Sequence, residues 1–160
     1  MSSPAAAPSA SVAVDGAALC RRHLAFGWSA LLCFVLFGLL LEALHGFKVD
    51  WYLGRAFETR RLLWRLAHAH GTLLAVLNLL FAFSATRLAA AKLLRASICF
   101  RAAAVLLPLG FFGGGVAVEG GDPHPLIALV PLGALFLVGG VFLLVRAALD
   151  GPREAGIAQS

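Results

Sequence analysis

Hydrophobic residues occur along this chain in four long blocks, which short polar segments separate. Each block is close to the roughly 20 apolar residues that an α-helix needs to cross a bilayer. The blocks are rich in Leu, Ala and Phe and lack period-two alternation, so helices are expected rather than membrane β-strands. The predicted spans are about 24–45, 66–86, 96–118 and 126–145. We therefore predict an all-α integral membrane protein, built as a four-helix antiparallel bundle.

The polar segments around these blocks complete the predicted organisation. Residues 1–19 are rich in Ala, Ser and Pro, so we expect a disordered tail there. Segment 46–65 mixes aromatic and charged residues, which is typical of the headgroup zone, so we expect an interfacial segment along the membrane surface. The second helix is expected to begin early, near Glu58. One membrane domain then covers 20–148, and 149–160 form a C-terminal tail.

Composition agrees with a membrane protein and argues against other classes. The 160 residues are 61% hydrophobic and 13% charged, and the mean hydropathy is +0.90, whereas soluble domains are nearer half apolar and a quarter charged. The net charge is +5, but the basic residues flank the apolar blocks and form no stripe with interleaved aromatics. The lipid bilayer is therefore the expected partner, and nucleic acid is not. The three cysteines are far apart, so no disulfide framework is expected.

Lysine and arginine set the expected orientation. If the four spans alternate in direction, one membrane side holds eight of these residues and the other side holds five. The eight are Arg21, Arg22, Arg87, Lys92, Arg95, Arg101, Arg146 and Arg153. The five are Lys48, Arg55, Arg60, Arg61 and Arg65. The positive-inside rule then places both termini in the cytoplasm, in a plasma membrane or a bacterial inner membrane.

The opposite, non-cytoplasmic side collects most of the imidazole and carboxylate groups, including four of the five histidines. The group consists of Glu42, His45, His68, His70, Glu119, Asp122 and His124. Such side chains converging in a helical bundle are the usual ligands of a metal site. Glu42 and His45 are three residues apart and share one helical face. Because only one E-x-x-H pair occurs, a single Zn²⁺, Cu or Fe ion is expected rather than a symmetric two-metal centre.

The same histidines are candidates for holding a b-type haem between facing helices. The candidate haem ligands are His45, His68, His70 and His124, and the candidate metal ligands are these four with Glu42. On a regular helix His68 and His70 project about 200° apart, so at most one is expected to face the bundle axis. The other is expected to meet headgroups or the surface segment.

Three functions are compatible with the sequence. The favoured hypothesis is a small membrane protein that binds a metal ion or haem through the His/Glu cluster, in redox chemistry or metal handling. The alternative is a structural or assembly subunit of a larger membrane complex, or a homo-oligomer, because the chain is small and has glycine notches. A small transporter protomer is the third, less favoured because no charge lines the middle of the bilayer. No Ser-His-Asp set or phosphate loop is present, so no catalytic residue is predicted.

Several of these residues also have a purely structural explanation. Asn78, near the middle of its span, is expected to find a hydrogen-bond partner on another helix. Glycines 113–115 are expected to form a packing notch. Glu42 is alternatively paired with Arg61 or Arg65, and histidines at helix ends are common interface residues.

Overall fold

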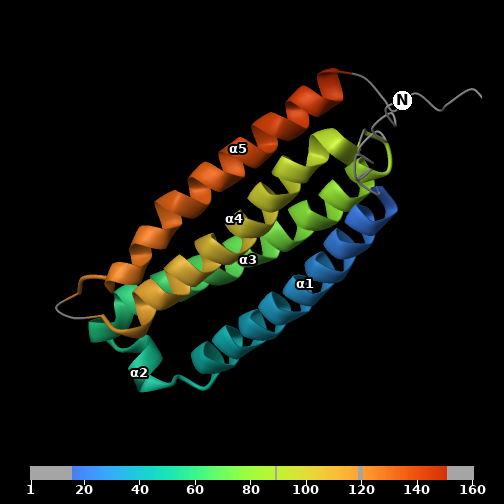
Figure 1. The fold of residues 1–160 in the computed structure, drawn as a ribbon. Helices are drawn as coiled ribbons and strands as arrows, with labels where there is room; N and C mark the ends of the chain where they lie inside the picture. The colour runs from blue at the N-terminus through green and yellow to red at the C-terminus, as the bar shows by residue number, and fades with distance from the viewer. Residues whose placement is uncertain (1–15, 89, 119–120, 151–160) are drawn as a thin grey trace, which may run out of the picture.

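The computed structural model describes residues 16–88, 90–118 and 121–150, with side chains for all of them except 90–92. Within these residues the secondary structure is helical, and no strand occurs (Figure 1). In chain order the elements are α1 (Gly16–Gly46), α2 (Asp50–Leu53), the 3₁₀ helix η1 (Arg55–Phe57), α3 (Glu58–Ala85), α4 (Ala90–Val116), the 3₁₀ helix η2 (Pro125–Ala128) and α5 (Leu129–Leu149). The prediction of an all-α chain is confirmed.

Four segments are long and apolar enough to cross a membrane, which confirms the predicted number of spans. They are Gly16–Gly46, Arg55–Ala85, Leu93–Val116 and Pro125–Leu149. The first helix begins at Gly16, eight residues before the predicted start at 24, so residues 16–19 of the predicted tail are helical. The rest of that tail, 1–15, and the last ten residues, 151–160, lie outside the described part of the chain.

The four long helices pack in the order of the chain (Figure 1). Helix α3 packs between α1 and α4, and α5 packs on the other side of α4. Within the described residues α1 touches α4 only slightly and does not touch α5. The antiparallel bundle is therefore an open row, with α1 and α5 at its two edges. Half of the most apolar stretch of α4 is buried, against 11% for α5, so the edge helices present most of their surface to their surroundings.

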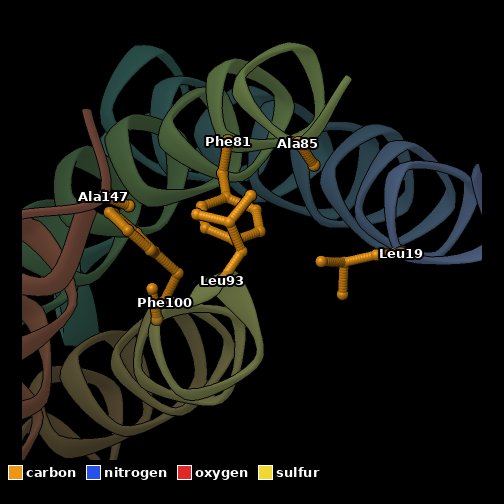
Figure 2. Packing of buried hydrophobic residues seen from close by; sticks show 7 residues of the cluster. Leu19, Phe81, Ala85, Leu93, Phe100 and Ala147 are labelled. Carbon is orange, nitrogen blue, oxygen red and sulfur yellow. The ribbon is translucent and has the colours of Figure 1, made fainter. Parts of the chain in front are cut away.

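Small residues and aromatic rings fill the core at the end of the bundle away from α2. There Phe81 of α3 meets Leu93 and Phe100 of α4, and the two phenyl centroids are 5.2 Å apart (Figure 2). Ala85 and Ala147 are also buried in this cluster. Such packing by short side chains allows close approach of helices, which is how helices associate where lipid removes the hydrophobic driving force.

The first turns of α3 hold the other end of α4. The Trp64 indole N–H donates to the carbonyl oxygen of Phe112 at 3.1 Å. The Arg60 guanidinium donates to the carbonyls of Gly115 at 3.0 Å and Val116 at 3.2 Å. A cation on the last carbonyls of a helix satisfies orphan acceptors and complements the helix dipole. Segment 46–65 is thus tied to the bundle through α3.

Glycines shape the close contacts between helices. The backbone of Gly71 on α3 lies against the ring of Phe34 on α1, where a methyl group would overlap the ring. A methyl group on Gly115 would come within 2.7 Å of the Trp64 ring. One on Gly113 would come within 2.7 Å of Leu126. The prediction that glycines 113–115 form a packing notch is confirmed.

We predict that Gly71→Ala destabilises the protein, because the added methyl group must displace the Phe34 ring in a packed interface. Overpacking of this kind costs roughly 1–3 kcal/mol. The matched control is Gly139→Ala on α5, where an added methyl group meets nothing within 4 Å, and a change within about 0.5 kcal/mol is expected. Reversible unfolding in mixed micelles measures both. Equal stability of the two variants would contradict the assigned α1–α3 packing.

Candidate functional site

A groove of about 1110 Å³ lies between α1, α2 and α3, at the end of the bundle that carries α2. Its polar lining residues are Glu42, His45, Tyr52, Arg65 and His68. Its apolar lining includes Val35, Leu39, Leu62, Leu66 and Ala69. Side chains of α1, α2 and α3 therefore line the groove, and three of the five predicted metal ligands are among them.

His68 is fixed in the groove by a hydrogen bond to the backbone of α1. Its Nδ1 lies 2.8 Å from the carbonyl oxygen of Phe34. Because a carbonyl can only accept, Nδ1 donates its proton in this bond. The ring lies directly against Gly38, where a Cβ atom would come within 2.9 Å of Nδ1. Gly38 therefore provides the space that the imidazole occupies.

Glu42 and Arg65 bring opposite charges to the same groove. Both side chains are exposed, and neither forms a hydrogen bond or an ion pair with another described residue. The suggested pairing of Glu42 with Arg61 is not formed, since the Arg61 guanidinium donates to the carbonyl oxygen of Leu53 at 2.9 Å. The carboxylate and the guanidinium of the groove are thus available to a ligand.

Tyr52 contributes a neutral hydroxyl. The side chain is 2% exposed and stacks on Trp64, with ring centroids 6.4 Å apart. Burial raises the pKa of the Tyr52 phenol, and this effect outweighs the opposing influence of the nearby Arg65 and Arg61 charges. The phenol is therefore protonated at neutral pH and is able to donate a hydrogen bond.

The remaining candidate residues lie outside the groove. His70 faces α4, because its Nδ1 donates to the carbonyl oxygen of Leu66 at 2.9 Å and its ring centroid lies 4.8 Å from that of Phe111. His124 caps η2, accepting a hydrogen bond from the Leu126 N–H at 3.3 Å. The side chains of His68 and His70 point in different directions, as their spacing predicts. However, His70 contacts the neighbouring helix α4, whereas a contact with lipid headgroups or the surface segment was expected. Asp122 is exposed, and Glu119 lies outside the described residues.

The predicted convergence of all the ligands does not occur in the part of the chain that the structure describes. No three His, Cys, Asp or Glu side chains are placed there to hold a metal ion. The open row of helices explains this, because the turn that carries His124 joins α4 to α5, whereas Glu42 and His45 are on α1. The groove keeps Glu42, His45 and His68, while His70 and His124 are directed elsewhere.

A second polar group lies near the opposite end of the bundle and joins three helices. His23 of α1 sits between Asn78 of α3 and Ser97 of α4, with Nδ1 2.9 Å from Asn78 Oδ1 and Nε2 2.7 Å from Ser97 Oγ. The Asn78 amide NH₂ donates to the Leu74 carbonyl at 2.8 Å, so its oxygen is the group that faces His23. His23 Nδ1–H then donates to Asn78, and Nε2 accepts from the Ser97 hydroxyl. We call His23, Asn78 and Ser97 the buried polar cluster.

Every ring nitrogen of this cluster is paired inside the protein. Hydroxyl, imidazole and amide follow the order of a nucleophile, a base and an orienting group, but these groups bond to one another, and no pocket that the structure describes includes them. The expectation that Asn78 bonds across helices is confirmed. The role of His23 in this cluster was not predicted from the sequence. Its spacing was the one signal, because His23 lies four residues before Gly27 and so on the same face of α1. Gly27 contacts Leu79, so this face is the one that packs on α3.

No protein family, no curated protein and no solved structure matches this chain. Its function is therefore inferred from the residues of the groove and of the buried polar cluster.

We predict that Asn78→Leu destabilises the bundle by roughly 1–2 kcal/mol, because it leaves the His23 Nδ1–H without an acceptor in an apolar interior. The control is Ser84→Ala, since among the described residues the half-buried Ser84 hydroxyl bonds only to the Leu80 carbonyl of its own helix. Unfolding in mixed micelles measures Asn78→Leu, Ser84→Ala, His23→Ala and the His23→Ala, Asn78→Leu double mutant. Full additivity of the two substitutions would contradict the coupling.

Proposed function

We propose that this chain is a small multi-pass membrane protein that binds an amphiphilic ligand in the groove between α1, α2 and α3. The observation that carries this proposal is that charged and polar side chains line the same groove as a row of apolar ones. A ligand with a polar head and a hydrocarbon tail matches both kinds of side chain at once.

The polar side chains of the groove support the proposal, because the Glu42 carboxylate and the Arg65 guanidinium form no hydrogen bond or ion pair within the described residues. Tyr52 adds a protonated hydroxyl to the same lining. Polar and charged groups at the edge of a membrane are costly to leave unpaired and are commonly functional. A bound head group would supply the missing partners.

The apolar lining extends along the helices. Val35 lies seven residues before Glu42 on α1, which is about 10 Å along the axis on the same helical face. Leu39 and Ala69 continue this lining on α1 and α3. The volume of about 1110 Å³ lies slightly above the range of about 300–1,000 Å³ that suits drug-sized ligands. This leaves room for a head group together with part of a chain.

We also propose where the protein lies in the cell and how it is oriented, on the basis of its topology. The four spans make the chain a multi-pass membrane protein. The excess of Lys and Arg at the ends away from the groove supports cytoplasmic termini, in a plasma membrane or a bacterial inner membrane. The groove then opens on the non-cytoplasmic side, at the depth of the headgroups.

The metal or haem hypothesis stays a prediction. In its favour, the Nδ1 bond of His68 to a backbone carbonyl is the support that metal-binding histidines usually have. Against it, protein zinc sites use three or four ligands, and none of the described residues forms such a set. Elemental analysis and an absorption spectrum of the purified protein test this hypothesis separately from the amphiphile. The transporter alternative likewise stays a prediction.

A second candidate function is that of a subunit in a larger membrane assembly. The open row favours it, because in the described part of the chain α1 packs mainly on α3 and α5 on α4, and both expose large apolar side chains such as Leu32 and Leu135. Light scattering of the protein in mild detergent or in nanodiscs tests this candidate. A particle mass of a single 16.8 kDa chain would count against a homo-oligomer.

We predict that Ala69→Trp abolishes ligand retention, because the indole fills the apolar part of the groove. The control is Leu135→Trp, an equally large indole on an exposed position of α5. Native mass spectrometry of protein released from bilayers of defined composition measures the retained amphiphile. Retention by both variants alike would show that bound molecules sit elsewhere on the surface.

A further inference from the structure

We infer that the ligand of the groove is a zwitterionic phospholipid with a primary ammonium head group, held by its phosphate at Arg65 and by its ammonium at Glu42. This inference rests on the proposed function and adds the chemical class of the ligand. Its starting point is that the groove holds two opposite charges that do not pair with each other.

Because these two charges do not pair with each other, they restrict the charge of the head group that the groove can bind. An anionic head group would satisfy Arg65 but place a second negative charge beside Glu42, and a cationic one would do the reverse. A neutral head group would leave both charges without partners. A head group that carries a phosphate and an ammonium a few bonds apart pairs with both charges, and the complex has no net charge from these four groups.

The phosphate end fits the donors of the groove. The guanidinium of Arg65 presents several N–H groups in a planar fork, which suits the oxygens of a phosphate. Tyr52 adds a hydroxyl that burial keeps protonated, so it donates rather than repels. Both residues line the same groove, at the end where the aromatic side chains Trp51 and Trp64 gather. Such aromatics are typical of the headgroup level of a bilayer.

The cationic end distinguishes an ammonium from a choline. A primary ammonium has three N–H donors, and the groove provides an acceptor for them at the Glu42 carboxylate. A quaternary ammonium has no N–H and is recognised by cages of aromatic faces. Tyr52 is the single aromatic residue among those that line the described groove. Phosphatidylethanolamine therefore fits better than phosphatidylcholine.

The test uses the full chain in nanodiscs that contain equal amounts of phosphatidylethanolamine, phosphatidylcholine and phosphatidylglycerol. Native mass spectrometry then identifies the lipid that stays with the released protein. We expect the wild type to prefer phosphatidylethanolamine over phosphatidylcholine about tenfold, the change that one charge-assisted hydrogen bond gives. In Glu42→Gln this preference should fall to about one, while lipid is still retained. In Arg65→Gln retention of every phospholipid should fall.

The matched control is Glu58→Gln, an exposed carboxylate on α3 that does not line the groove, and it should keep the wild-type preference. Equal retention of the three lipids by the wild type would overturn the inference and leave the proposed amphiphile site standing. A preference that survives in Glu42→Gln would also overturn it. If the wild type retains no lipid at all, the proposed function fails together with the inference.

Discussion

Polar groups inside a membrane must find partners other than bulk water, and the two ends of this bundle meet that constraint in different ways. At one end the buried polar cluster pairs the imidazole, the amide and the hydroxyl of three helices with one another. At the other end Glu42 and Arg65 face a groove without any described partner. In the first arrangement the polar groups satisfy one another inside the protein, so its role is structural. In the second, the carboxylate and the guanidinium have no protein partner, and a bound ligand can provide one.

Both arrangements depend on the contact between α1 and α3. Gly71 admits the ring of Phe34, Gly38 admits the ring of His68, and Gly27 lies against Leu79. These contacts recur along the interface and keep the two helices close from the buried polar cluster to the groove. The same contacts fix the ring of His68, which lines the groove. Helix packing in this protein is therefore also what shapes the site.

Much of the fold was predictable from the sequence, because span length and apolar composition are properties of single segments. The need of Asn78 for a partner on another helix and the notch at glycines 113–115 were also predictable, since each follows from the chemistry of the residue itself. The open row was not predictable. It depends on which faces of four helices meet, and hydrophobicity is a poor guide to this when lipid is as apolar as the core.

The candidate site was predictable only in part for the same reason. Spacing along one helix correctly linked Glu42 with His45 and separated His68 from His70. The prediction grouped residues by membrane side alone and ignored their positions around the bundle. His124 was therefore grouped with residues of α1, although the open row of helices separates it from them. His23 was left out of the predicted group because it lies beside Arg21 and Arg22 on the opposite membrane side. In the structure its helical face directs it into the contact with α3 and α4.

The most direct test of the proposed ligand site is an experimental density map of the protein in a lipid nanodisc. We expect elongated density in the groove, with its broad end between Glu42 and Arg65 and its narrow end along Val35 and Leu39. A map in which α1 and α3 close over an empty groove, or in which Glu42 and Arg65 pair with each other, would contradict the proposed site.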